Sequence, residues 1–336
     1  MTATLRACGT PLAEAYDLAL VDLDGVAYAG HLPIEHAAAS LVAARERGLA
    51  QVFVTNNASR EPEDVAGQLS ELDIPTRADD VMTAAQACAA LLRTRLDPGA
   101  RVLVVGGAGL VTAVRKAGFV VVRSAQDDPA AVAQGYAAEL GWHDLAEAAY
   151  AVAAGAWHVA SNRDMSLPTA RGFAPGNGAL VAAVVAATGV EPDSAGKPAP
   201  TMFRLAVDEH GAERPLVIGD RLDTDLAGAR SAGYPGLHVL TGVSSARDAV
   251  LASPGLRPDF VGADLRSLLE PHPAPEQEDG WWRCGGRAAR VVDDRLELDR
   301  EGPAGIDLVR AACAAAWDAV DAGTRLDAAS VPDLQG

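Results

Sequence analysis

The stretch that decides the fold lies near the start of the chain, where residues 18–26 read LALVDLDGV. Leu18–Val21 is a short, fully apolar run, which is typical of a strand buried on both faces of a parallel sheet. Two acids, Asp22 and Asp24, follow this run, and Gly25 permits a sharp turn after them. Ligands of open parallel sheets bind beyond the carboxyl ends of the strands, so we expect chemistry at this point.

Other short apolar runs alternate with helical stretches, which predicts an α/β protein with a mostly parallel sheet. A helix is expected from Pro33 to Gly48, because proline favours helix starts and glycine favours helix ends. Residues 81–96 predict another helix, and Asp223 is predicted to cap a helix over Asp225–Ala232. Further strands are expected at Gln51–Val54, Arg101–Val105, Val120–Val122, Trp157–Val159, Leu216–Ile218 and Leu237–Leu240.

The C-terminal part of the chain has a different organisation. Pro271–Asp279 contains three prolines and three acids, which predicts a linker. Beyond it, Trp281–Asp299 alternates like a β-hairpin and Gly305–Ala322 predicts a helix. We therefore expect a small appended unit at this end.

Composition excludes several classes of partner. The 336 residues carry a formal net charge of −17, and so acidic a surface repels nucleic acid and anionic membranes. It also repels phosphate esters, so a site for one needs local positive potential from a metal ion, a lysine or helix N-termini. The longest apolar run, Ala179–Ala187, is too short to cross a bilayer, and the first twenty residues lack a signal-peptide pattern. A soluble, cytoplasmic protein is expected.

A second polar cluster, Thr55-Asn56-Asn57, ends the strand expected at Gln51–Val54. Its hydroxyl, amide and exposed backbone N–H groups could hold phosphate oxygens. Followed by Ser59, the same residues would equally form a plain loop and a helix N-cap. Taken alone, the cluster favours the loop.

A third cluster, GDRLDTD at residues 219–225, ends the strand expected at Leu216–Ile218. Asp220 and Asp225 could join Asp22 around one Mg²⁺, which prefers oxygen ligands and keeps several waters. The sequence therefore offers a candidate magnesium site built from separate strand ends.

A fourth feature is Lys197, in the segment AGKP at residues 195–198. The prolines at 198 and 200 fit a first helical turn, which would place Lys197 at a helix N-terminus, where positive charge is unfavourable. A bound anion there would explain it. Only two of the 28 basic residues are lysines, and a compact ammonium suits a phosphate.

In this order, the D-x-D-G-V, T-N-N, G-K-P and G-D-x-x-x-x-D motifs resemble the four motifs of the haloacid dehalogenase superfamily of phosphatases. The long region between the second and third motifs resembles the subfamily with a large α/β cap, which includes p-nitrophenylphosphatases and phosphoglycolate or glycerol-3-phosphate phosphatases. The resemblance implies a Rossmann-like three-layer core over residues 1–82 and 181–270 and an inserted cap over 83–180. A C-terminal extension over 280–336 lies outside the family pattern.

By that resemblance, Asp22 is the nucleophile that forms an aspartyl-phosphate, and Asp24 is the general acid and later the base. The residues implied to hold phosphoryl oxygens are Thr55, Asn56 and Lys197. The groups implied to bind Mg²⁺ are Asp22, the backbone carbonyl of Asp24 and Asp220, with Asp225 supporting.

The resemblance predicts a phosphatase acting on a small phosphate monoester, with glycerol 3-phosphate or phosphoglycolate as the expected substrate. Nucleotide or pyridoxal phosphate hydrolysis is the alternative within the family. Candidates for contacting the leaving group are Asn162, Arg163 and Asp164, in a stretch without the aromatic cluster that a nucleobase would stack on.

Two rival functions differ in their demands on the sequence. Dehalogenation needs neither an acid at Asp24 nor a metal, so Asp24 and Asp220 argue against it. A non-catalytic phosphometabolite-binding protein would not need every catalytic residue, and all are present. The expected partner is a small phosphorylated metabolite, and a homodimer stays open.

Overall fold

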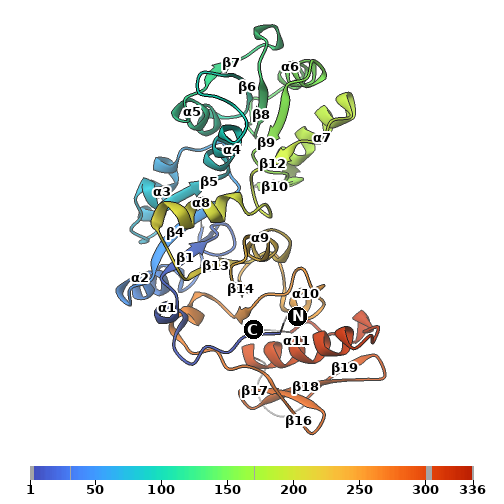
Figure 1. Cartoon of the computed structure of the whole chain (residues 1–336). Helices are drawn as coiled ribbons and strands as arrows, with labels where there is room; N and C mark the ends of the chain where they lie inside the picture. Colours follow the sequence, from blue (N-terminus) through green and yellow to red (C-terminus); the bar gives the residue numbers. More distant parts are fainter. Residues whose placement is uncertain (1–3, 31, 170, 300–304, 335–336) are drawn as a thin grey trace. The chain divides into compact units, whose positions relative to one another are not determined.

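The computed structural model describes residues 4–30, 32–169, 171–299 and 305–334. They form the predicted α/β protein, and contacts divide it into two compact units (Figure 1). The first unit comprises residues 1–51 and 210–336, and the second comprises residues 52–209. Within the described ranges, each helix is too short or too polar to cross a membrane.

A parallel sheet forms the centre of the first unit. Its strand order is β15-β14-β13-β1, and β4 begins beside β1, where the Ala50 N–H donates to the Asp17 carbonyl at 3.1 Å. Every residue of β1 and β13 is buried, as expected for central parallel strands. The strands are β1 (Leu18–Val21), β4 (Ala50–Thr55), β13 (Pro215–Gly219), β14 (Gly236–Val239) and β15 (Phe260–Gly262). The strands predicted in this unit are thus confirmed.

The helices of this unit differ from the sequence-based expectation in two places. Pro33 does not start a helix, because it pairs with Tyr28 in a short antiparallel hairpin, and α2 begins only at Ala37. Asp223 does not cap a helix, because it lies inside a π-helical turn, η3, and α9 begins after that turn. The hairpin strands are β2 (Tyr28–Ala29) and β3 (Leu32–Pro33). The helices around the parallel sheet are α1 (Leu12–Ala15), α2 (Ala37–Glu46), η3 (Leu222–Leu226), α9 (Ala227–Ala232), α10 (Ala246–Val250) and η4 (Leu265–Leu269).

The C-terminal extension packs onto the rest of this unit. Helix α11 lies across an antiparallel sheet of order β16-β17-β18-β19 (Figure 1). Its elements are β16 (Glu276–Glu278), β17 (Trp281–Cys284), β18 (Arg287–Val292), β19 (Arg295–Leu298), α11 (Ile306–Asp321) and η5 (Ala328–Ser330). The predicted hairpin is therefore part of a larger sheet, and the predicted helix is confirmed.

One hydrophobic cluster joins the extension to the helices of the parallel sheet. It contains Ala249 and Leu226 as well as Cys313 and Trp317, all almost fully buried. The C-terminal extension therefore has its own sheet and helix but shares a hydrophobic core with the rest of the first unit. The stretch predicted as a linker is also structured: His272 forms an antiparallel bridge with Cys8, and β16 follows.

The second unit contains a parallel sheet of order β12-β9-β8-β6-β7 and the pair β4–β5. Its strands are β5 (Val81–Thr83), β6 (Arg101–Val105), β7 (Val120–Val122), β8 (Ala131–Gln134), β9 (Trp157–Ala160), β10 (Ser166–Thr169), β11 (Gly172–Pro175) and β12 (Asp193–Ser194). Its helices are α3 (Pro62–Glu71), η1 (Ala78–Asp80), α4 (Ala84–Arg93), α5 (Ala108–Lys116), η2 (Ala125–Asp127), α6 (Trp142–Ala153), α7 (Asn177–Thr188) and α8 (Thr201–His210).

The predicted helix over residues 81–96 starts late. Residues 81–83 form a strand instead, and Thr83 caps α4 by accepting a hydrogen bond from the Gln86 N–H while the Gln86 side chain accepts from the Thr83 N–H. This reciprocal capping box fixes the start of the helix at Ala84.

Candidate active site

Three carboxylates meet at the carboxyl ends of β1 and β13. Single oxygens of Asp22, Asp220 and Asp225 all lie within 4.8 Å of one another, with Asp22 half-buried and the other two fully buried. The Asp22 N–H donates to the Ile218 carbonyl at 2.9 Å, which continues the pairing of the two strands into the site. The parallel sheet thus brings together acids that are distant in sequence, as its strand ends predict.

The turn after Asp22 presents Asp24 at the surface. Asp24 is exposed, and its Oδ1 accepts a hydrogen bond from the Gly30 N–H at 3.2 Å. Gly25 has φ +89°, in the left-handed region that favours glycine. A Cβ added there would lie 2.4 Å from Asp220 Oδ2, so the turn also requires the missing side chain for close approach.

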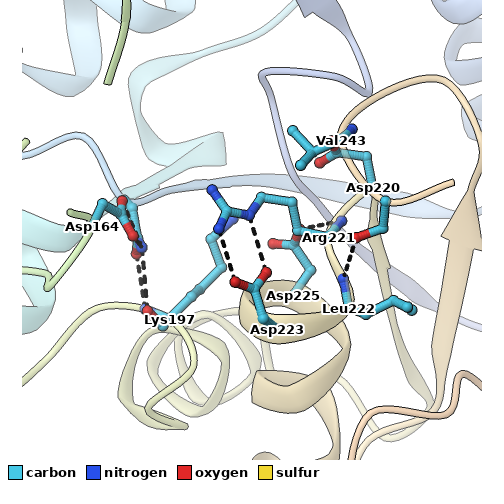
Figure 2. A network of polar contacts seen from close by, with 10 residues as sticks. Asp164, Lys197, Asp220, Arg221, Leu222, Asp223, Asp225 and Val243 are labelled. Atoms are coloured by element: carbon cyan, nitrogen blue, oxygen red, sulfur yellow. Dashed lines mark hydrogen bonds and ion pairs between the residues drawn. The ribbon is translucent and has the colours of Figure 1, made fainter. Parts of the chain in front are cut away.

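Asp225 is held by the turn that carries it. Its Oδ2 accepts from the Arg221 N–H at 3.2 Å, inside the π-helical turn η3. The Arg221 guanidinium donates hydrogen bonds to both carboxylate oxygens of Asp223, at 3.1 and 2.9 Å (Figure 2). This pairing holds the pKa of Asp223 below its usual range and directs the Asp223 carboxylate to Arg221.

This donor set fits a hard divalent cation. Three neighbouring carboxylates, two of them buried, repel one another unless positive charge lies among them. Mg²⁺ prefers oxygen ligands and is commonly bound by a few carboxylates with water completing the shell. The residues Asp22, Asp220 and Asp225 therefore suit magnesium chemically.

A second polar network lies in the second unit, centred on Asn56. Its Nδ2 donates to both oxygens of Asp164 at 3.1 Å, and its Oδ1 accepts from the Lys197 N–H at 2.8 Å. The Asn162 side chain donates to the Asn56 carbonyl at 2.7 Å. Asn56, Asn162, Asp164 and Lys197, each singled out in the sequence, thus lie together.

Lys197 does not lie at a helix N-terminus, since α8 begins only at Thr201. It is instead buried, and its Nζ donates to the Val54 carbonyl at 3.1 Å (the lysine is labelled in Figure 2). Thr55 is nearly buried at the end of β4, where its Oγ1 accepts from the Asn57 N–H at 3.1 Å. This network fixes an ammonium group and a hydroxyl at neighbouring positions along β4.

Arg163 points away from this network toward solvent. Its guanidinium pairs with Glu191 at 2.7 Å, and both side chains are more than half exposed. Phe173 in β11, the aromatic residue nearest in sequence to this stretch, is 83% exposed.

Sequence reasoning missed one segment of the carboxylate site, residues 241–245 after β14. The Val243 N–H donates to Asp220 Oδ2 at 2.6 Å (Figure 2), and the Thr241 hydroxyl donates to the Gly25 carbonyl at 2.6 Å. The signal was available, because this segment follows a predicted strand of the same sheet at its carboxyl end.

Comparisons with known proteins agree with this geometry. Residues 19–120 match the haloacid dehalogenase-like hydrolase model, and residues 194–268 match a HAD-hydrolase-like model. Residues 284–332 match a GCN5-related N-acetyltransferase-like domain.

Similar proteins cover most of the chain. A D-glycerol 3-phosphate phosphatase of Mycobacterium tuberculosis is 47% identical over 92% of this chain and 88% of its own length. An acid sugar phosphatase of Staphylococcus aureus is 36% identical over 76% of this chain and 98% of its own length. About a quarter of this chain therefore has no counterpart in the staphylococcal protein.

Solved structures show the same likeness. The crystal structure of glycerol phosphate phosphatase from M. tuberculosis in complex with magnesium has a TM-score of 0.85 and 44% identity, covering 92% of each chain. A p-nitrophenyl phosphatase from Archaeoglobus fulgidus has a TM-score of 0.70 and 28% identity, covering 76% of this chain and 98% of that one.

Proposed function

The chain belongs to the haloacid dehalogenase-like hydrolase family as a Mg²⁺-dependent phosphatase, and on that premise we propose that it hydrolyses glycerol 3-phosphate through an aspartyl-phosphate on Asp22. The choice of substrate rests on one observation: the 47% identity to the D-glycerol 3-phosphate phosphatase extends over 92% of this chain. Phosphoglycolate, also a small anionic monoester, is the second substrate we would test.

The two acids after β1 have different roles in the proposed reaction. A carboxylate oxygen of Asp22 attacks phosphorus, and the bond from phosphorus to the glycerol oxygen breaks as Asp24 donates a proton to that oxygen. Asp24 then takes a proton from water, whose oxygen attacks phosphorus and releases inorganic phosphate and Asp22. The hydrogen bond from the Gly30 N–H orients the Asp24 carboxyl for both proton transfers.

Asp22, the Asp24 carbonyl and Asp220 would hold the magnesium ion, with Asp225 supporting. When bound, Mg²⁺ neutralises charge on the phosphoryl group and on the three clustered carboxylates. Asp225 is itself held by the Arg221 N–H, which supports a role in fixing the turn that bears Asp220.

Thr55 and Lys197 would bind the phosphoryl oxygens, with Asn56 as a third contributor. The Lys197 ammonium offsets charge that develops on phosphorus, and burial strengthens this effect. The Asn56 side chain already bridges Lys197 and Asp164, so its contribution to phosphate would come through its backbone and through positioning of Lys197.

Residues 83–180 would act as the cap that selects the leaving group. The catalytic core would comprise residues 1–82 and 181–270, and the C-terminal extension residues 280–336. Asn162, Arg163 and Asp164 are the proposed specificity residues. A polyol leaving group suits hydroxyl-binding amide and carboxylate groups, whereas a nucleobase would want an aromatic partner. The acidic chain and the small substrate suit a cytoplasmic metabolic enzyme.

The test compares kcat/KM for glycerol 3-phosphate, phosphoglycolate, UMP, AMP and pyridoxal phosphate in purified protein. We expect the first or second to exceed the others by tenfold or more, about 1.4 kcal/mol of transition-state binding. A tenfold preference for a nucleotide or pyridoxal phosphate would overturn the substrate. Absence of p-nitrophenyl phosphate hydrolysis with Mg²⁺ would favour the non-catalytic alternative instead.

A further inference from the structure

The segment 241–245, here called the clasp loop, connects β14 to α10 and contacts both acid-bearing turns of the first unit. Its Thr241 hydroxyl donates to the Gly25 carbonyl at 2.6 Å, and its Val243 N–H donates to Asp220 Oδ2 at 2.6 Å. The Ser244 N–H donates to the Asp220 carbonyl at 3.0 Å. The clasp loop therefore holds both the backbone and the carboxylate of Asp220.

The fit between the clasp loop and Asp220 is close. A Cβ added at Gly242 would lie 2.0 Å from Asp220 Oδ2, so the loop backbone packs directly on the carboxylate. Ser244 also accepts a hydrogen bond from the Leu222 N–H at 3.1 Å, which ties the loop to η3. A small shift of this loop would therefore move a proposed metal ligand.

The loop runs straight into α10, whose buried side packs against the C-terminal helix. Ala249 of α10 and Trp317 of α11 belong to one hydrophobic cluster, with Ala249 fully buried and Trp317 2% exposed. The Trp317 Nε1–H donates to the Ala249 carbonyl at 3.1 Å. The Ala249 carbonyl also accepts from the Ala252 N–H at 3.2 Å, so the tryptophan adds a second bond to a group at the end of α10 and joins the two helices there.

Two arginines outside the extension also bind groups of the extension. The Arg257 guanidinium is buried, lies 5.3 Å from the Trp317 ring and pairs with Asp321 of α11 at 2.7 Å. Arg247 of α10 donates to the carbonyls of Val331 and Ala328, at 3.0 and 2.8 Å. The short helix α10 is thus held by α11 on its buried side and by the chain after α11 through Arg247.

We propose that the C-terminal extension positions the magnesium ligand Asp220, acting from Trp317 through α10 and the clasp loop, with Trp317 and Thr241 as positioning residues. The inference rests on the proposed function for the role of Asp220. The three clustered carboxylates found among the described residues all lie outside the extension, and this role gives a reason for the core that the extension shares with the parallel-sheet part of the unit. Trp317 affects the affinity for Mg²⁺, whereas phosphate binding by Lys197 and Thr55 does not depend on Trp317.

The test measures Mg²⁺ binding by isothermal titration calorimetry in full-length Trp317→Phe, without substrate. Phenylalanine keeps most of the apolar contact and loses the donor to Ala249. Trp282→Phe is the matched control, because Trp282 packs on the same cluster but its Nε1–H donates to Asp318 of α11 rather than to α10. We expect Kd for Mg²⁺ to rise about fivefold or more in Trp317→Phe and less than twofold in the control.

Kinetics separate positioning from general loss of structure. At saturating Mg²⁺, Trp317→Phe should recover most of its kcat with an unchanged KM for the phosphate ester, because only metal affinity is affected. Thr241→Val, which keeps the side-chain shape and loses the hydroxyl, should also raise Kd for Mg²⁺ several-fold, and it serves if the tryptophan variant does not fold. A normal Kd in folded Trp317→Phe would overturn the role of the extension, and a normal Kd in Thr241→Val would overturn that of the loop.

These outcomes are distinguishable from failure of the proposed substrate. If glycerol 3-phosphate is not hydrolysed but Kd for Mg²⁺ rises in Trp317→Phe, the positioning role stands and the substrate assignment falls. If wild-type protein binds no Mg²⁺ at millimolar concentration, the positioning role falls with the metal site.

Discussion

Gly25 lies against the buried carboxylate of Asp220, close enough that a Cβ at Gly25 would meet Asp220 Oδ2 at 2.4 Å. The turn that carries Asp24 and the strand end that carries Asp220 are therefore fitted to each other by the absence of a side chain. Since Asp220 Oδ2 is also bonded to the Val243 N–H, the carboxylate cannot move away without losing that bond.

Gly25→Ala should weaken Mg²⁺ binding by tenfold or more, because the added methyl group displaces Asp220. Gly30→Ala is the matched control: Gly30 also has positive φ, at +63°, but has open space around it. Both variants carry the backbone strain of alanine in the left-handed region, about 1 kcal/mol or more. Calorimetric Mg²⁺ titration of both variants checks this, and equal affinities would contradict the packing argument.

Asp22→Asn should abolish turnover while leaving the fold intact, because the amide is nearly isosteric but cannot attack phosphorus. Steady-state hydrolysis of p-nitrophenyl phosphate measures this, with circular dichroism as the check on folding. More than a trace of activity in the purified variant would rule out Asp22 as nucleophile.

Asp24→Asn should still accept phosphate from a substrate with a good leaving group but hydrolyse the phosphoenzyme slowly. Loss of a general acid–base group typically costs about 10²–10⁴-fold, roughly 3–5 kcal/mol of barrier. Rapid-quench sampling should show the phosphoenzyme accumulating. Equal slowing of both half-reactions would mean that the roles of the two acids are wrongly divided.

EDTA should inactivate the enzyme and Mg²⁺ should restore it, because the carboxylates of Asp22, Asp220 and Asp225 lie within 4.8 Å of one another. Ca²⁺ should inhibit, since its larger and looser coordination misplaces the attacking carboxylate. Activity after removal and readdition of each ion measures the effect. Full activity in demetallated protein would refute the metal role of Asp220.

Stability should fall in acid partly through His272, whose pKa burial lowers to about 4. Its Nδ1 accepts from Arg310 at 3.2 Å and its Nε2–H donates to the Ser267 carbonyl at 2.8 Å, so the neutral ring fits and a protonated ring would face a guanidinium. Between about pH 6.5 and 4 the unfolded chain binds a proton that the folded chain does not. The stabilisation is complete above pH 6.5 and declines below it, at about 1.4 kcal/mol per pH unit.

Urea unfolding of wild type and His272→Gln at pH 7, 6 and 5 tests this. The variant should lose part of the pH dependence rather than all of it, because burial lowers the pKa of His238 to about 4 as well. Identical slopes in the two proteins would show that His272 titrates normally.

The sequence by itself determined where the central strands lie. Strands buried on both faces must be apolar at every position, so Leu18–Val21 could be predicted to the residue. The order of the four motifs pointed to the family, and the two acidic motifs and the amide motif directly follow strands β1, β13 and β4. Short elements such as β8, and the exact start of α4, were missed because a capping box or a polar strand residue has little periodicity of its own.

Tertiary structure alone decided which groups meet. Sequence spacing predicted that Asp220 and Asp225 could join Asp22. It could not show that Asp223 would turn to Arg221, because the π-helical turn η3 sets that direction. Nor could it show that the C-terminal helix would share a core with α10, since an amphipathic helix specifies an apolar face but not the surface that buries it. That choice, made by packing, is what links Trp317 to the site of Asp220.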